Sequence, residues 1–360
     1  MPPEDDFRRD HDPRRRRTAG LVGALIAACL VALAAGVWLA RDQSTSTQPV
    51  ALPTSSAPGP NTPRALAPTP VPAEPVLGFS FSVAYDAAAH QLVTFGGVDS
   101  YDTTWLWDGH RWAFARPSVT PPGRFAAAAA FDPLTGVVML YGGRLGPGQV
   151  VDDTWAWDGR TWRQLDGGTG TPPLGEGSVM AWDDVAGQMV LVSNQPAPYG
   201  GTWAWNGSRW MRQAHGDLPS GTSLIGMAVD PVTRMLLGVS CCLAGNGTTS
   251  TLAWDGAAWH QLNTGTAPSF TVGLVRDPAS ARLLMFGDPS TDSGKDIWAW
   301  TGHDWSLVTG AHLPNFPAGA VTDTNAGHVL IVGSVTEPVQ GNPQPVHVWS
   351  LMGSTWHQLA

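Results

Sequence analysis

Residues 155–162 read Trp-Ala-Trp-Asp-Gly-Arg-Thr-Trp, and this pattern of tryptophans around an Asp-Gly pair occurs six times along the chain. The copies occupy residues 105–112, 155–162, 203–210, 252–259, 298–305 and 349–356, the later ones in degraded form. Their closing tryptophans are 46 to 51 residues apart, and 16 of the 18 tryptophans belong to the pattern. A recurrence this regular indicates six structural repeats.

A second feature precedes each copy, namely an aspartate followed ten residues later by glycine or serine. The pairs are Asp86/Gly96, Asp132/Gly142, Asp183/Ser193, Asp230/Ser240, Asp277/Gly287 and Asp323/Gly333. In the second pair, Asp132 opens the sequence Asp-Pro-Leu-Thr-Gly, and the apolar run 137–141 follows it. Proline fixes φ and glycine accepts a positive φ, so this segment predicts a turn before a strand. Each repeat then has four strands: before the aspartate, after the turn, at the paired tryptophans, and from the closing tryptophan.

Four antiparallel strands per repeat of about 50 residues are typical of a propeller blade. The predicted fold class is all-β: a six-bladed β-propeller of four-stranded antiparallel blades, preceded by one transmembrane helix and a disordered linker. We place the propeller at 77–360. The blades lie at about 77–123, 124–175, 176–220, 221–269, 270–315 and 316–360. Alternate strand residues share a face, and mostly small residues separate the paired tryptophans, so we expect these tryptophans to pack between blades rather than to stack on sugars.

The repeats resemble kelch repeats and the bacterial propellers described as galactose-oxidase-like. The double glycine that ends the second strand of a kelch repeat is present as Gly96-Gly97 and Gly142-Gly143, and it is lost in the other four units. The arginine that opens the first kelch strand is matched only by Arg124. The resemblance covers about residues 77–360 and implies the architecture, but it implies no ligand.

The N-terminal part predicts a membrane anchor. Residues 18–40 carry no charge over 23 positions, which is long enough for a helix to span a bilayer. Four arginines precede this segment, so residues 1–17 are expected to form a cytoplasmic tail and the propeller to lie outside the cytoplasm. A cleaved secretory signal, or a lipoprotein signal ending at Cys29, are the alternatives. Residues 41–76, rich in Pro, Ser and Thr, predict a disordered linker.

The charge of the chain and the residue types that it contains argue against several classes of function. From Leu77 onward, 22 acidic residues face 11 arginines and one lysine, so binding of nucleic acid is not expected. The ten histidines show no metal-ligand spacing, and no catalytic constellation is evident, so we expect no cofactor, no metal and no enzymatic activity. Galactose oxidase needs a copper site with Tyr and Cys ligands. The four tyrosines and the vicinal Cys241-Cys242 pair do not match that site, so the resemblance does not extend to this activity.

Candidate binding residues lie in the connections between the second and third strands of a blade and between consecutive blades. These connections vary in length, and variable loops on a rigid scaffold commonly carry binding sites. The candidates are Tyr101, Arg144, Tyr199, Lys295, His312 and Glu337. Cys241 and Cys242 follow a second strand and form a possible vicinal disulfide, with disulfides between chains or two free thiols as the alternatives.

The predicted function is that of a membrane-anchored extracytoplasmic module that binds or scaffolds a cell-envelope protein or glycan without catalysis. A carbohydrate-active hydrolase or lyase with carboxylates at the central pore is the alternative, because propellers also support enzymes. A third hypothesis is a sensor component that signals through the short basic tail.

Overall fold

The computed structural model describes residues 74–77, 80–98, 102–146, 148–166, 172, 175–195, 200–220, 222–240, 249–264, 273–286, 296–312, 317–335 and 344–359. The predicted transmembrane helix at 18–40 and residues 41–73 of the predicted linker lie outside this range. Within it, no helix is long and apolar enough to cross a membrane.

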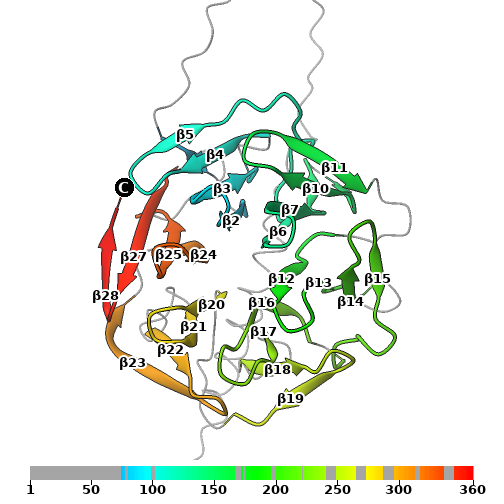
Figure 1. The fold of residues 1–360 in the computed structure, drawn as a ribbon, viewed down its shortest axis with the longest axis vertical. Coiled ribbons are helices and arrows are strands. Elements are labelled where there is room, and N and C mark those ends of the chain that lie inside the picture. The colour runs from blue at the N-terminus through cyan, green and yellow to red at the C-terminus, as the bar shows by residue number, and fades with distance from the viewer. Residues whose placement is uncertain are drawn as a thin grey trace, which may run out of the picture. The chain divides into compact units, whose positions relative to one another are not determined.

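Six four-stranded antiparallel sheets make up a β-propeller in the described part of the chain. The first three blades are β2 (Ser82–Asp86), β3 (Gln91–Phe95), β4 (Thr104–Trp107) and β5 (Trp112–Phe114); β6 (Ala128–Asp132), β7 (Val137–Tyr141), β10 (Thr154–Trp157) and β11 (Trp162–Asp166); and β12 (Val179–Asp183), β13 (Gln188–Ser193), β14 (Gly201–Trp205) and β15 (Trp210–Arg212). The last three are β16 (Leu224–Val229), β17 (Leu236–Ser240), β18 (Ser250–Trp254) and β19 (Trp259–Leu262); β20 (Gly273–Asp277), β21 (Arg282–Phe286), β22 (Asp296–Trp300) and β23 (Trp305–His312); and β24 (Pro317–Asp323), β25 (His328–Gly333), β27 (His347–Met352) and β28 (Thr355–Gln358). We call the four strands of a blade A to D in chain order. Figure 1 shows the A strands around the centre of the ring and the D strands along its rim.

The repeated aspartates close the A–B turns. Each carboxylate accepts the backbone N–H groups of the residues two and three positions further on, as Asp86 does from Ala88 and Ala89 at 3.0 Å. The same pair of bonds recurs in the other five blades, at Asp132, Asp183, Asp230, Asp277 and Asp323. A side chain that accepts from both N–H groups stabilises the turn through local contacts alone. The recurring aspartate is therefore explained by local hydrogen bonding.

The Asp-Gly pair closes the C–D turns of the first, second and fourth blades in the same way. Asp158 accepts from the N–H groups of Arg160 and Thr161 at 2.9 and 2.8 Å, and Gly159 has a φ of +88° that disfavours other residues. In the fourth blade the N–H of Ala258, followed by a side-chain hydrogen bond from His260, lowers the pKa of Asp255 to about 2. Because neighbouring strands of each blade run antiparallel, the A–B and C–D turns lie on one face of the ring, which we call the turn face. The B–C and D–A connections lie on the other, the loop face.

The tryptophans form the contacts between blades. Thirteen of the 16 in the repeats are buried and the other three are partly buried, so the expected packing role is observed. The closing tryptophan of one blade also donates its Nε1–H to a threonine that opens strand C of the preceding blade. These bonds are Trp162 to Thr104 at 3.0 Å, Trp210 to Thr154 at 2.9 Å, Trp259 to Thr202 at 2.7 Å and Trp305 to Thr251 at 2.8 Å. They join blades one to five in series.

The two interfaces of the sixth blade lack this bond. Ile297 stands at the threonine position of the fifth blade and Val348 at that of the sixth. The tryptophans that face these positions, Trp356 and Trp112, have buried Nε1 atoms without a hydrogen-bond partner. A buried unsatisfied donor costs about 1–3 kcal/mol, so the sixth blade is joined to its neighbours less strongly by these contacts.

Replacing threonine by an apolar residue, or the apolar residue by threonine, should change the stability in opposite directions. We expect Thr251→Val to lower the free energy of unfolding by about 1–3 kcal/mol, because Trp305 loses its acceptor. Val348→Thr should raise it by about 0.5–1.5 kcal/mol, because Trp112 gains one. Urea unfolding of both variants measures the effects. A loss of stability in Val348→Thr equal to that in Thr251→Val would contradict this explanation.

A short sheet outside the blades also holds the first and last blades together. β1 (Val76–Leu77) pairs antiparallel with β26 (Gln344–Pro345), which lies in the B–C connection of the sixth blade. The expected boundary between linker and propeller, at residues 76 and 77, therefore falls inside a strand. Each blade is built from contiguous sequence, and the segment before the first blade closes the ring through β26 rather than by adding a strand to a blade.

Candidate functional site

The loop face of the second blade carries the best-described cluster of charged side chains. Its B–C connection is a small hairpin of β8 (Arg144–Leu145) and β9 (Gln149–Val150), in which Arg144 pairs with Val150. Backbone bonds to Phe125, 2.9 Å from Arg144 N to Phe125 O and 3.1 Å in return, hold Arg144 against the start of strand A. The backbone of Arg144 is therefore held by two sets of contacts, the pairing with Val150 and the hydrogen bonds to Phe125.

The double glycine creates the bend that starts this hairpin. Gly142 and Gly143 have φ values of +66° and +98°. A Cβ on Gly142 would lie 2.5 Å from Cα of Gly175, so the D–A connection passes directly against it. Val151 donates to Gly143 O at 3.0 Å and accepts from Gly175 N at 3.2 Å, which ties the two loops together. Glycine is thus required here both for backbone conformation and for the close approach of two chain segments.

Arg144 and Glu176 form an ion pair between these loops. The Arg144 Nη2 donates to Glu176 Oε2, and the two side chains are 33% and 27% exposed. The Nε of Arg144 is buried without a hydrogen-bond partner. Next to the pair, Gln195 Nε2 donates to Glu176 O at 3.5 Å. Both charged groups remain accessible from solvent although their positions are fixed.

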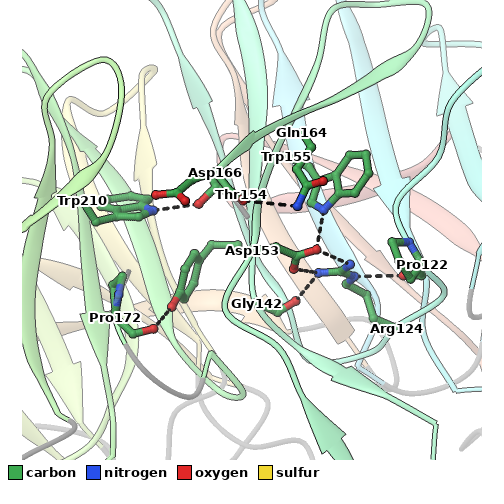
Figure 2. Close-up of polar contacts among 11 residues, drawn as sticks. Pro122, Arg124, Gly142, Asp153, Thr154, Trp155, Gln164, Asp166, Pro172 and Trp210 are labelled. Atoms are coloured by element: carbon green, nitrogen blue, oxygen red, sulfur yellow. Dashed lines mark hydrogen bonds and ion pairs between the residues drawn. The ribbon is translucent and has the colours of Figure 1, made fainter. Parts of the chain in front are cut away.

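A buried ion pair lies in the same blade and supports the loops (Figure 2). Arg124, which is 1% exposed, donates from Nη1 and Nη2 to the two carboxylate oxygens of Asp153 at 2.5 and 3.0 Å. It also donates to Pro122 O at 3.0 Å and to Gly142 O at 2.9 Å. Trp155 Nε1 donates to Asp153 Oδ2 at 2.7 Å. Arg124 therefore joins the preceding D–A connection, the glycine bend and the end of the B–C loop.

Tyr141 ends strand B beside this pair and anchors the next connection. Its hydroxyl donates to Pro172 O, and its ring packs against Trp210 with centroids 5.8 Å apart. Burial, together with Asp152, Asp153 and Asp166, raises the pKa of Tyr141. The hydroxyl therefore remains a donor at all physiological pH values. Asn194 holds the following connection, with its amide bonded to Gly177 O at 2.8 Å and to Leu224 O and N at 2.6 and 2.8 Å.

Of the candidates chosen from the sequence, Arg144 is the one whose side chain the structure describes. Tyr101, Tyr199, Lys295, Glu337, Cys241 and Cys242 lie outside the described residues. His312 ends β23, and its side chain is not described. The vicinal disulfide therefore stays a prediction. Sequence reasoning missed Glu176, which has no counterpart in the repeat, and Asp153, which contacts an arginine 29 positions away.

The described cluster is a polar surface without an excess of positive charge, since Asp152 and Asp166 also lie near Tyr141. Arg124 with Asp153 and Arg144 with Glu176 are two pairs of opposite charge. Within the part of the chain that the structure describes, no group of three or more His, Cys, Asp or Glu side chains could hold a metal ion. The exposed pair offers a guanidinium donor beside a carboxylate acceptor, which suits a ligand that both donates and accepts hydrogen bonds.

No protein family and no curated protein sequence matches the chain. Solved structures do. YjhT superposes with a TM-score of 0.55 at 15% identity, covering 80% of this chain and 99% of its own. The SapL1 lectin in complex with α-methyl fucoside gives a TM-score of 0.50 at 13% identity, covering 79% and 96%. The fucose-specific lectin from Aleuria aurantia gives 0.51 at 14% identity, covering 80% and 96%. At these identities the similarity establishes the propeller fold alone.

Proposed function

We propose that this chain is a non-catalytic glycan-binding module of the kelch type, held at the outside of the cell membrane by residues 18–40. The observation that carries the proposal is the half-exposed Arg144–Glu176 pair on the loop face. Neighbouring hydroxyls of a sugar can donate to the carboxylate and accept from the guanidinium, and both groups are already positioned. The cluster has no excess of positive charge, which favours an uncharged ligand over a phosphorylated one.

Two further observations support the same function. The SapL1 lectin, which binds α-methyl fucoside, and the fucose-specific lectin from Aleuria aurantia share this fold. The double glycine at Gly142-Gly143, which bends the chain toward the loop face, and the buried Arg124 match the kelch pattern at the two positions where the second blade preserves it.

The absence of catalysis is part of the proposal and rests on the groups to which the following carboxylates are already bonded. The six A–B turn aspartates bond to their own turns on the turn face. Asp153 accepts both Arg124 amino groups and the Trp155 indole, and Glu176 is paired with Arg144. Glycoside hydrolysis needs two carboxyl groups on either side of a bond, one of them able to give up a proton. These carboxylates instead accept hydrogen bonds from their own turns or are paired with an arginine.

Loss of one partner of the exposed pair should weaken glycan binding strongly. We expect Arg144→Met to reduce affinity for the best-binding glycan of an array by roughly 10- to 100-fold, because one charge-assisted hydrogen bond contributes about 1.5–3 kcal/mol. Glu176→Gln should cause a smaller loss, since the amide can still accept one bond. Titration of the purified full-length chain measures both.

The matched control is Arg209→Met. Arg209 is exposed in the C–D turn of the third blade, on the turn face, so its replacement should leave the affinity unchanged. The proposal is wrong if no glycan on the array binds the wild-type chain, or if Arg144→Met and Arg209→Met bind as the wild type does.

The predicted topology can be tested separately. A reporter enzyme fused after Ala360 should be active only when the propeller is exported, as the arginines before residue 18 predict. Protease added to spheroplasts should then remove the propeller and leave a small membrane-bound fragment. A full-length chain that resists the protease would contradict the predicted orientation.

A further inference from the structure

The six A–B turns lie around the centre of the turn face, because the A strands surround the centre of the ring (Figure 1). Turns of neighbouring blades touch. Asn325 of the sixth blade donates from Nδ2 to Ala87 O of the first at 3.1 Å, and a Cβ on Gly136 of the second blade would lie 3.7 Å from the Cβ of Ala88. We call these six turns the inner ring, which consists of residues 86–90, 132–136, 183–187, 230–234, 277–281 and 323–327.

Three consecutive turns of the inner ring expose a large aliphatic side chain. Leu134 is 75% exposed, Val185 56% and Val232 70%, and each stands two positions after the aspartate of its turn. The other three blades carry small or polar residues at this position, namely Ala88, Ala279 and Asn325. A single exposed aliphatic residue is ordinary, but equivalent ones in adjacent blades form a patch that favours contact with a partner.

Arg234 occupies a strained position of the inner ring. Its φ is +63°, and its N–H donates to Asp230 O at 2.9 Å. In three other blades a glycine makes the same bond with a positive φ, namely Gly136, Gly187 and Gly327. The first and fifth blades tolerate other residues at this position, namely His90 and Ala281. Because glycine adopts this conformation without strain, the turn itself does not explain the arginine, and its side chain is a candidate for function.

Arg234 belongs to a group of charged side chains from three blades. Its Nη1 donates to Asp184 Oδ2 at 3.1 Å, and Nη1 of Arg276 lies 3.7 Å from the same oxygen. Arg282 is exposed at the start of β21, directly after the turn of the fifth blade. The aspartates that close these three turns are buried and accept backbone N–H groups. The charged groups that a partner meets here are therefore three guanidinium groups and the Asp184 carboxylate.

These arginines keep hydrogen-bond donors for a partner. A guanidinium has five N–H donors, and the bond to Asp184 uses the Nη1 of Arg234 alone. Arg276, at 3.7 Å, is too far from the same carboxylate for a hydrogen bond. The two arginine side chains are 53% and 45% exposed. Carboxylates are the protein groups that bind a guanidinium with two parallel hydrogen bonds, so the arginines and the neighbouring valines suit a segment with acidic and aliphatic side chains.

The edge of the turn face disfavours an anionic lipid surface as the partner. Asp108, Asp158 and Asp255 are exposed in C–D turns, which lie farther from the centre of the ring than the A–B turns (Figure 1). A flat anionic bilayer that reached the inner ring would also approach these carboxylates and be repelled by them. A narrow protein segment can contact the inner ring alone.

We propose that the inner ring binds a protein segment in which acidic side chains stand next to aliphatic ones. The carboxylates of this segment bind Arg234 and Arg276, and its aliphatic side chains cover Val185 and Val232. The surface lies on the opposite face from the Arg144–Glu176 pair, so the chain can hold a glycan and a protein at the same time. The proposal does not depend on the function proposed above.

The test selects short peptides from a displayed library of random sequences on the purified full-length chain. The enriched peptides should contain more Asp and Glu, and more Leu, Ile and Val, than the library, and their affinity should fall as the salt concentration rises. Arg234→Gly should weaken binding of the best peptide roughly 10- to 100-fold, because charge-assisted hydrogen bonds are lost. Val232→Ser should weaken it about fivefold, because apolar contact is lost. Fluorescence anisotropy of the labelled peptide measures both changes.

Arg234→Gly also separates a binding role from a structural one. It introduces the residue that three other blades carry at this position of the turn, and the ion pair that it removes is half-exposed. The midpoint of thermal unfolding should therefore stay the same or rise while peptide binding is lost. A purely structural arginine would show the reverse, a lower midpoint with unchanged binding.

The matched control is Arg160→Gln, which removes an exposed arginine from the C–D turn of the second blade on the same face and should leave the peptide affinity unchanged. Arg144→Met should keep the peptide and lose the array glycan, whereas Arg234→Gly should do the opposite. The proposal is overturned if no peptide is enriched, if the enriched peptides lack acidic residues, or if they bind Arg234→Gly as tightly as the wild type. Hydrogen exchange of the full-length chain in nanodiscs tests the lipid alternative. Slower exchange of the inner ring in phosphatidylserine discs than in phosphatidylcholine discs would identify lipid headgroups as the partner and would also overturn the proposal.

Discussion

Replacing Asp153 with alanine should lower the free energy of unfolding by about 3–5 kcal/mol, the largest effect that we expect from a single polar side chain in this molecule. The substitution leaves the Arg124 guanidinium, 1% exposed, without its carboxylate, and it removes the acceptor of the Trp155 indole. Arg124 keeps only the carbonyl oxygens of Pro122 and Gly142 as partners. A buried charge without a counter-ion is much more costly than the missing bonds alone. Chemical denaturation of the purified chain, followed by tryptophan fluorescence, measures the loss.

The control is the ion pair between Arg212 and Asp217, with a separation of 2.6 Å and side chains that are 39% and 64% exposed. Asp217→Ala should cost no more than about 1 kcal/mol, because solvent screens an exposed pair. Replacing both partners of the buried pair, as Arg124→Met with Asp153→Leu, should recover most of the stability lost in Asp153→Ala. Equal effects of Asp153→Ala and Asp217→Ala would show that burial does not set the energy of the Arg124 pair.

Trp210→Ala is the second substitution with a large expected effect. Trp210 is 2% exposed, packs against Tyr141 and Trp205 with ring centroids 5.8 and 5.3 Å away, and donates to Thr154 at 2.9 Å. Its removal leaves a cavity between the second and third blades, for which the cost is about 3–5 kcal/mol. The loss of the hydrogen bond to Thr154 adds to this cost.

Trp356 is the matched control because it occupies the same position in the sixth blade. It is only partly buried, contacts Phe286 at 6.3 Å between ring centroids, and has no hydrogen-bond partner for its Nε1. We expect Trp356→Ala to cost at least about 1 kcal/mol less than Trp210→Ala. Urea unfolding under identical conditions compares the two. A larger loss for Trp356→Ala would mean that the Trp–Thr bonds do not distinguish the interfaces.

The sequence predicts the blades well because what builds a blade is local and repeated. The aspartate of the A–B turn in all six blades, and the Asp-Gly pair of the C–D turn in three, satisfy backbone donors within three residues, so short stretches of sequence carry the signal. The Trp–Thr bonds also recur, since in four blades a threonine of strand C stands directly before the repeated tryptophan pattern. The threonines are visible in the sequence, but the tryptophan that binds each of them belongs to the next blade, more than 50 residues away.

The binding face is harder to predict because its contacts do not recur. Arg124 reaches Asp153 across 29 positions and Arg144 reaches Glu176 across 32. Glu176 has no equivalent in the other blades, and Asp153 has one only in Asp296 of the fifth blade. The closure through β26 is hidden for a similar reason: two residues before the first blade pair with a loop of the last one. Only the three-dimensional arrangement shows that these segments meet. The sequence indicates Arg144 as a candidate because it lies in a connection of variable length between the second and third strands of a blade.

Hydrogen exchange of the full-length chain, with and without the best-binding glycan of an array, tests the central claim most directly. If the Arg144–Glu176 pair binds the glycan, the backbone amides around Arg144 and those around Glu176 become slower to exchange, since both loops contact the ligand. Amides of the C–D turns at residues 158–162 and 206–210 should exchange at the same rate in both samples. Protection confined to those turns, or no protection around Arg144 and Glu176, would contradict the account.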